Sequence, residues 1–368
     1  MRLNIDEIFF GGTPAHRAVC YGEVDSLAEL QRRGVDLNGY DKDGDTPAHV
    51  AATNGNIAVL RELQRLGVDL NAPNRDGETL ANAAACTEKI IVLIELFNLG
   101  VNLNAPNRNG ETSAHVAAHF GYLEVLEHLK KLDVALDAQN NNGDTAAHYA
   151  ARAGKSDVLS KLHHFGINLN IQNIEGDAPI HIAAYKRQID VLKRLHDLGV
   201  NLNTPNRDGT TLVHIAAHLS DLNLLEHLKK LDVDLDAQNN DGNTAAPHAV
   251  RLGKQDVLSK LFYFGINLNI QNIKGDGLIH IAARTGQIRI LKWLYEFSPS
   301  SLGIQNKVGD TPAHKAAPMK QMAALSVLRR LGASFSIQNN EGDTPANIAF
   351  FPKLNSTMSA SHHLSLYD

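Results

Sequence analysis

A ten-residue pattern recurs along almost the whole chain at a spacing of about 33 residues. It reads DGDTPAHVAA at residues 43–52, NGETSAHVAA at 109–118, EGDAPIHIAA at 175–184 and VGDTPAHKAA at 308–317. The glycine of this pattern occurs eleven times, with nine intervals of 33 and one of 34. Such a period predicts a repeat architecture in which each unit packs on its neighbours. The length of 368 residues therefore reflects a number of repeats rather than two or three separate globular domains.

The residues of one repeat predict two short helices and a projecting loop. Thr46 suits a helix N-cap, and Pro47 suits the first helical position, where its missing N–H has no intrahelical role. Gly55 ends this inner helix. Residues 57–66 carry apolar side chains at helical spacing and predict an outer helix, which Gly67 ends in the left-handed conformation. The following loop places asparagine at one turn position in nine repeats, because asparagine tolerates unusual dihedrals and bonds its own backbone.

These motifs resemble the T-P-L-H-x-A signature of ankyrin-repeat proteins, and the resemblance covers roughly residues 8–352. It implies an all-α repeat solenoid in which each repeat consists of a β-turn or hairpin loop and two antiparallel helices. We expect a single elongated curved domain over residues 1–352, followed by a C-terminal cap or flexible tail at 353–368. The repeats are expected to start near residues 8, 41, 74, 107, 140, 173, 206, 239, 272, 306 and 339.

Several positions depart from the pattern. Asn82, Pro247 and Asn347 replace the motif histidine, and each lost imidazole hydrogen bond should cost about 0.5–1.5 kcal/mol. Asp133 and Asp232 stand where glycine usually ends the outer helix, and aspartate is one of the few residues that tolerate that conformation. The loop at 297–305 carries the single extra residue, so we expect a local change of solenoid twist there.

A longer repeat overlies the shorter period. Residues 123–134 match 222–233, and residues 156–177 match 255–276, in both cases 99 positions later. Repeats four to six and seven to nine are therefore interpreted as a duplicated three-repeat block. Because the two copies share the same scaffold, the positions at which their sequences differ are the informative ones.

Composition excludes several classes of protein. The formal charge of −5 gives no electrostatic reason to expect nucleic acid, and no stretch approaches the ~20 apolar residues of a membrane span. The first residues, MRLNIDEIFFGG, carry acids where a secretory leader needs an apolar run. Two cysteines make no disulfide framework. We expect a monomeric cytoplasmic protein without a cofactor.

Metal and catalytic sites are not expected. Cys86 and His119 at equivalent positions of neighbouring repeats make a Cys–His dyad conceivable, but no orienting third residue is evident. Cys20 lies two repeats from Cys86, too far for a disulfide. Trp293 falls where the outer helix needs a core residue. The family resemblance implies that the motif histidines bond the neighbouring turn, and they are too far apart to share an ion; they are His16, His49, His115, His148, His181, His214, His280 and His314.

Ankyrin stacks bind partners through a concave groove of inner-helix surface and loop tips, which identifies candidate binding residues here. Successive repeats place basic and aromatic residues at the end of the inner helix, and these types are common at interface hot spots. The row favours an acidic or phosphorylated protein segment as partner. The inner-helix candidates are His119, Phe120, Arg152, Tyr185, Lys186, Arg187, His218, Leu219, Arg251 and Arg284, and the loop-tip candidates are Arg75, Arg108 and Arg207.

These patterns predict a non-enzymatic protein-interaction scaffold. A narrower hypothesis is an effector that an intracellular bacterium translocates into a host cell by a non-Sec system, because the Ser-rich tail with Leu366 resembles type IV secretion signals. Two alternatives stay open: a cysteine-dependent enzyme using Cys86 and His119, and a purely structural spacer or oligomeric scaffold.

Overall fold

The computed structural model describes residues 12–350, and its contacts divide the chain into two units, Met1–Asp208 and Gly209–Asp368. Each unit is described by itself below as unit 1 and unit 2. All regular elements in the described range are helices. They form ten inner–outer pairs followed by the first helix of an eleventh repeat, which confirms the predicted all-helical repeat array. The expected single curved domain stays a prediction, and the tail at 353–368 lies outside the described residues.

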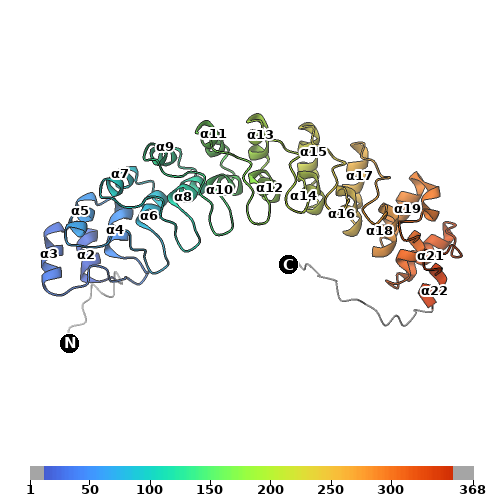
Figure 1. Cartoon of the computed structure of the whole chain (residues 1–368), viewed down its shortest axis with the longest axis horizontal. Helices are drawn as coiled ribbons and strands as arrows, with labels where there is room; N and C mark the ends of the chain where they lie inside the picture. The colour runs from blue at the N-terminus through green and yellow to red at the C-terminus, as the bar shows by residue number, and fades with distance from the viewer. Residues whose placement is uncertain (1–11, 351–368) are drawn as a thin grey trace. The chain divides into compact units, whose positions relative to one another are not determined.

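Unit 1 contains six helix pairs in which inner helices form one layer and outer helices another, with the loops projecting from the inner layer (Figure 1). The inner helices are α2 (Pro14–Tyr21), α4 (Pro47–Asn54), α6 (Leu80–Cys86), α8 (Ser113–Phe120), α10 (Ala146–Arg152) and α12 (Pro179–Tyr185). The outer helices are α3 (Val24–Arg32), α5 (Ile57–Arg65), α7 (Ile90–Asn98), α9 (Leu123–Lys131), α11 (Ser156–His164) and α13 (Ile189–Asp197).

Unit 2 continues the same pattern with four pairs and a last inner helix (Figure 1). Its inner helices are α14 (Leu212–His218), α16 (Ala245–Arg251), α18 (Leu278–Thr285), α20 (Pro312–Ala316) and α22 (Pro345–Phe350). Its outer helices are α15 (Leu222–Lys230), α17 (Gln255–Tyr263), α19 (Ile288–Phe297) and α21 (Met322–Arg330), and a short 3₁₀ helix η1 (Pro299–Gly303) follows α19.

The predicted helix ends are confirmed in the second repeat. The Thr46 side chain accepts a hydrogen bond from the backbone N–H of His49, and Pro47 occupies the first helical turn. Gly55 and Gly67 both adopt φ +85°, the left-handed conformation that favours glycine. Small and aliphatic side chains fill the core between the two helical layers, and Ala51 is fully buried. No aromatic residue is among the buried hydrophobic side chains of the described residues.

The motif histidines join neighbouring repeats. In each, the ring Nε2–H donates to a backbone carbonyl of the next loop; for His49 the acceptor is Glu78 O at 3.0 Å. In most of them Nδ1 accepts a backbone N–H at the N-terminus of its own helix, as His148 accepts that of Thr145 at 3.0 Å. We call this bond from a histidine ring to the next loop a histidine strut. All eight expected struts are present, from His16, His49, His115, His148, His181, His214, His280 and His314.

Asn82 and Pro247, two of the residues that replace the motif histidine, behave differently. The expected loss of the inter-repeat bond is wrong for Asn82, because its amide nitrogen donates to Glu111 O at 3.1 Å and so reaches the same loop carbonyl as an imidazole would. Pro247 has no side-chain donor, so the strut from α16 to the next loop is missing. Asp133 (φ +59°) and Asp232 (φ +54°) adopt the left-handed conformation, as predicted.

The loops of successive repeats pack closely on each other. The side chain of Asn173 donates to Asp144 Oδ1 at 2.8 Å, and five other loop asparagines likewise donate to a side-chain carboxylate of the preceding loop. At Gly176 (φ +81°) a Cβ would lie 2.4 Å from the backbone nitrogen of Arg207. Glycine is therefore required at this turn both by its conformation and by the next loop.

Candidate partner-binding surface

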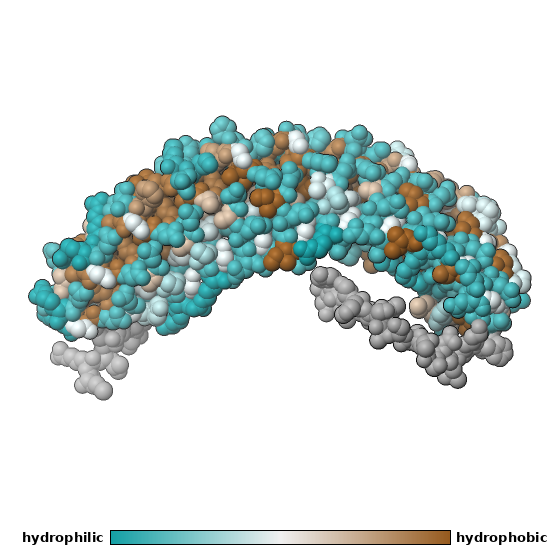
Figure 2. Space-filling model, viewed as in Figure 1, coloured by the Kyte–Doolittle hydropathy of each residue, from teal (hydrophilic) through white to brown (hydrophobic). Residues whose placement is uncertain are grey.

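We define the inner-helix face as the C-terminal ends of the inner helices together with the loop tips. In unit 1, helices α8, α10 and α12 are successive neighbours. Phe120 at the end of α8 and Tyr185 at the end of α12 are 44% and 38% exposed, and Lys186 next to Tyr185 is exposed as well. Large aromatic side chains at that exposure present apolar area that a partner could bury. Figure 2 shows the loop edge of unit 1 as mostly hydrophilic, although Ile174 in one of these loops is 53% exposed.

A polar network lies between these exposed residues and the core. The hydroxyl of Tyr149 donates to Glu111 of the preceding loop and accepts from Asn140 Nδ2 at 3.0 Å. Burial opposes ionisation of Glu111, but hydrogen bonds from Tyr149 and Asn107 outweigh it and lower the pKa of this carboxyl. Burial and the adjacent carboxylate raise the pKa of Tyr149. The network fixes the Tyr149 ring, which packs edge-on to the His115 ring at 5.1 Å.

The Arg152 side chain is held against the protein by contacts with its neighbours and does not extend freely into solvent. Its Nη2 lies 2.6 Å from the buried carboxylate of Asp144, and its guanidinium stacks over the Tyr149 ring at 5.2 Å. Burial works against the Asp144 charge, but bonds from Arg152 and Asn173 outweigh it and lower the pKa of Asp144. Sequence spacing did not reveal this pair. Arg152 therefore contributes less free positive charge to unit 1 than the sequence pattern indicates.

The loop-tip arginines use their stems for packing. Arg75 donates its backbone N–H to Gly44 O at 2.9 Å, and its guanidinium lies 5.3 Å from the centre of the Tyr40 ring. The stem of Arg108 covers Gly77 of the preceding turn, where a Cβ would lie 2.2 Å from Arg108 Cγ. All three tip arginines, Arg75, Arg108 and Arg207, are exposed.

In unit 2 the same face is built from His218, Leu219, Arg251 and Arg284 at the ends of α14, α16 and α18. His218 and Arg251 are exposed, whereas Leu219 and Arg284 are half-buried. Arg251 donates from Nη2 to Nδ1 of His248 at 3.2 Å. The Nε2 of His248 is buried without a hydrogen-bond partner.

A small polar cavity of about 170 Å³ lies in this part of unit 2. Arg251 and Arg284 border it from the inner helices α16 and α18. Loop residues complete the lining, namely Asp241, Asn243, Asn272, Ile273, Lys274 and Asp276, together with Ile281 of α18. The cavity therefore lies on the inner-helix face of unit 2.

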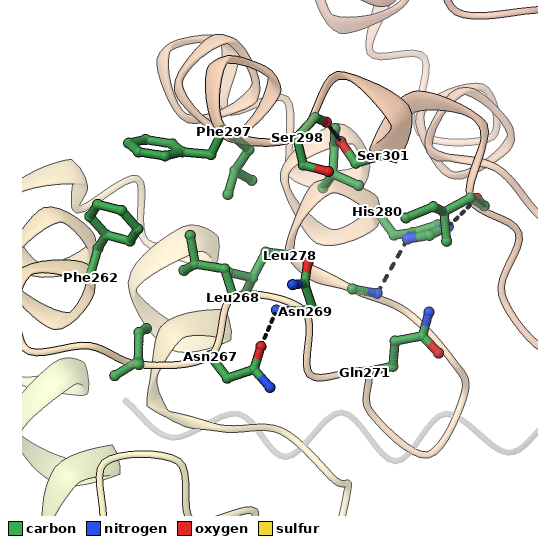
Figure 3. Close-up of a pocket in the computed structure, with 15 residues that line it drawn as sticks. Phe262, Asn267, Leu268, Asn269, Gln271, Leu278, His280, Phe297, Ser298 and Ser301 are labelled. Carbon is green, nitrogen blue, oxygen red and sulfur yellow. Dashed lines mark hydrogen bonds between the residues drawn. The ribbon is translucent and has the colours of Figure 1, made fainter.

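A larger, more apolar cavity of about 420 Å³ accompanies the extra residue of the 297–305 loop. Phe262 of α17 and Phe297 of α19 lie at one side, and Ser298 and Ser301 lie above Leu278 (Figure 3). Leu268 is half-buried here, whereas the leucines at the equivalent position of earlier repeats, such as Leu169, are buried. The insertion thus removes the usual cover from Leu268, a consequence that the sequence period does not reveal.

Trp293 extends the same aromatic cluster. Its ring lies 4.5 Å from that of Phe297 and 5.5 Å from that of Phe262. The prediction of a core position is correct only in part, because Trp293 is half-buried and its two aromatic neighbours are exposed.

The Cys86–His119 pair lacks the features of an activated nucleophile. Both side chains are exposed, and Cys86, like Cys20, is a free thiol. Burial and the nearby charge of Glu78 raise the pKa of Cys86, whereas an activated thiolate needs a lowered pKa. The His119 ring instead packs edge-on against Phe120 at 5.1 Å.

Within residues 12–350, no group of three or more His, Cys, Asp or Glu side chains is arranged to hold a metal ion. No helix of the described chain is long and apolar enough to cross a membrane.

Comparison with protein families identifies the repeat. The family model described as ankyrin repeats (3 copies) matches residues 2–74, 80–173, 125–206 and 180–272. Comparison with curated proteins finds no similar sequence. The matches cover most of the chain, and the helix pairs and histidine struts agree with them. The chain belongs to the ankyrin-repeat family.

Proposed function

We propose that the protein is a binding scaffold whose inner-helix face in unit 1 takes up an acidic or phosphorylated segment of a partner protein. The observation that carries the proposal is the exposure of Phe120 on α8 and of Tyr185, beside Lys186, on α12, the two inner helices that flank α10, in a family that generally binds proteins. Aromatic anchors supply buried area, and the cation favours an acidic segment.

The surroundings support this surface as a rigid platform. The Tyr149 and Arg152 side chains between the two anchors are already fixed by Glu111 and Asp144. Few rotamers would be lost there when a partner binds, so less of the interaction free energy is spent on ordering.

The test uses an array of short synthetic peptides, each in acidic, phosphorylated and neutral versions, probed with the purified full chain. Phe120→Ala with Tyr185→Ala should weaken binding at least 10-fold, because anchors of this kind contribute about 2 kcal/mol or more. Ile91→Ala with Phe97→Ala is the matched control, since both residues are exposed apolar side chains on the outer helix α7. Equal losses in the two double variants would refute the assignment to the inner-helix face.

Charge is tested separately. Lys186→Glu should weaken binding of acidic peptides and reduce its dependence on salt, whereas Lys193→Glu on the outer helix α13 should not. If neutral peptides bind as tightly as acidic ones, the proposal that the partner segment is acidic is refuted, whereas the proposal of a binding scaffold stands.

The narrower hypotheses receive no support from the described residues. The tail with the secretion-like pattern lies outside them, and deletion of residues 353–368 in a translocation assay tests it directly. The raised pKa of Cys86 argues against the enzyme alternative, and slow labelling by a mild thiol electrophile at pH 7 is the expected result.

A further inference from the structure

The two copies of the duplicated block carry opposite charge at one set of positions. The nine residues that line the 170 Å³ cavity of unit 2 each have a counterpart 99 positions earlier in unit 1. In unit 1 these positions hold one cation, Arg152, and three carboxylates, Asp144, Glu175 and Asp177, for a net charge of −2. In unit 2 they hold three cations and two carboxylates, for a net charge of +1.

Four of these positions differ in charge between the units. Three of the changes make unit 2 more positive, and Asp241, where unit 1 has Asn142, offsets one of the added charges. Asn243 stands where unit 1 has Asp144, so Arg251 lacks the carboxylate that binds Arg152. Lys274 replaces Glu175, and Arg284 replaces Tyr185. The loop contact survives the first change, because Asn272 Nδ2 still donates to Asn243 Oδ1 at 3.3 Å. The backbone frame is thus kept while its internal counter-charge is removed.

The remaining carboxylates do not neutralise the cavity. Asp276 is already held by Lys315 Nζ at 3.3 Å and by Asn306 Nδ2 at 2.7 Å. Asp241 is exposed at the loop tip, where its charge partly offsets that of Arg251. With Lys315 counted against Asp276, the cavity wall has a charge of about +2 when empty.

The two arginines oppose each other when no anion is present. No carboxylate lies within ion-pair distance of Arg251 or Arg284 among the described residues. Burial, and after it the charge of Arg284, lowers the pKa of Arg251. Two cations held together without a counter-ion are a cost that a bound anion would relieve.

We propose that this cavity binds the phosphoryl group of a phosphorylated side chain, with Arg251 and Arg284 as its ligands and Lys274 at its rim. A guanidinium fork matches phosphate oxygens, and a phosphoserine or phosphothreonine carries about −1.5 to −2 charges at pH 7, close to the charge of the wall. The volume of about 170 Å³ admits a tetrahedral oxyanion with several waters, which take about 30 Å³ each in the liquid.

The proposal rests on the proposed function, because it assumes that the phosphoryl group arrives on a partner segment. Inorganic phosphate tests the cavity without that assumption. Calorimetric titration of the full chain, at an ionic strength fixed with chloride, should show saturable binding of one phosphate. Arg251→Gln and Arg284→Gln should each weaken it about 10- to 100-fold, and Arg289→Gln on the outer helix α19 should leave it unchanged.

The sharpest variant is Asn243→Asp, which restores the unit 1 counter-charge and removes no cation. It should weaken phosphate binding at least 10-fold while the fold is retained, since unit 1 already accommodates aspartate at the equivalent position. The reverse exchange in unit 1, Asp144→Asn with Glu175→Lys and Tyr185→Arg, should raise the stoichiometry from one phosphate to two.

Absence of saturable phosphate binding, or binding that Asn243→Asp leaves unchanged, would overturn the cavity assignment. A phosphoserine peptide and its serine and glutamate versions form the second arm. If inorganic phosphate binds but the phosphoserine peptide binds no more tightly than its serine and glutamate versions, the proposal that the phosphoryl group belongs to a partner segment is overturned. The cavity would then be a site for free phosphate. Phe120→Ala with Tyr185→Ala should leave inorganic phosphate binding intact, so that failure of the unit 1 platform is distinguished from failure of the cavity.

Discussion

Replacing His248 by tyrosine should make unit 2 more resistant to acid. Burial, followed by the charges of Arg251, His214 and His218, lowers the pKa of His248 to about 3, whereas an unfolded histidine titrates near 6.5. The unfolded chain therefore takes up the proton first as the pH falls. The stability that depends on neutral His248 is fully present above pH 6.5 and is lost as the pH drops toward 3.

The magnitude follows from these two pKa values. Proton uptake by the unfolded state alone costs about 1.4 kcal/mol of stability at pH 5.5 and about 2.7 kcal/mol at pH 4.5. A folded pKa one unit higher changes the second figure by only about 0.1 kcal/mol, because the folded pKa would still lie below pH 4.5.

His248→Tyr removes this loss and copies Tyr149, the residue at the equivalent position of the other block. A tyrosine hydroxyl there can accept from Asn239, as Tyr149 accepts from Asn140. Urea unfolding followed by the fluorescence of Trp293, the single tryptophan, which lies in unit 2, gives the free energy at pH 7.5 and pH 4.5. The drop between the two should be smaller in the variant by about 2.7 kcal/mol, the whole linkage contribution of His248.

The matched control is His164→Tyr, an exposed histidine whose counterpart in the duplicated block is Tyr263. It should show the same pH dependence as the unmodified chain. Surface substitutions change stability by roughly 0.5 kcal/mol. If the loss of unfolding free energy between pH 7.5 and pH 4.5 is the same in His248→Tyr and in the control within that margin, His248 takes up its proton in the folded state without loss of stability. The reasoning from its burial would then be wrong.

Two further predictions concern unit 1. Gly176→Ala should cost about 2–4 kcal/mol, because its Cβ would meet the backbone of Arg207, whereas Gly166→Ala, with open space around the same left-handed conformation, should cost about 1–2 kcal/mol in chemical unfolding. Equal costs would show that loop contact adds nothing. Tyr149→Phe should lower the free energy of unfolding by about 1–3 kcal/mol at pH 7, because it removes the hydrogen bond to ionised Glu111. This loss of stability should become smaller below the lowered pKa of the Glu111 carboxyl. A loss that does not change with pH would contradict the network.

Periodicity predicted the fold well because each repeat carries all the local signals it needs. Thr46, Pro47 and Gly55 define the inner helix from short-range chemistry, and the structure places its ends at those residues. The strut from His49 could be expected from the family alone. Such features depend on neighbours in sequence or on one neighbouring repeat, and the repeat period supplies both.

The candidate site was less predictable because charge depends on partners in space. Asp144 immediately precedes the N-cap of α10 and Arg152 is the last residue of that helix, and nothing in their spacing indicates an ion pair. Arg152 and Arg251 occupy equivalent positions in the row of basic residues, but only Arg152 forms an ion pair with a carboxylate at the position of Asp144. Asn82 shows the same limit for hydrogen bonds, since only the structure shows that its shorter side chain still reaches Glu111 O.

The proline at position 247 also affects how unit 2 holds together. Helices α16 and α18 lie side by side without the histidine strut that His214 and His280 supply at the adjoining interfaces. Arg251 and Arg284 stand on those two helices, so an anion between them would bridge the interface that lacks a strut. Cohesion there becomes ligand-linked, growing with the logarithm of ligand concentration above its dissociation constant. An anion bound in the cavity would then strengthen the packing between α16 and α18. Because each repeat packs on its neighbours, this would change the stiffness of unit 2.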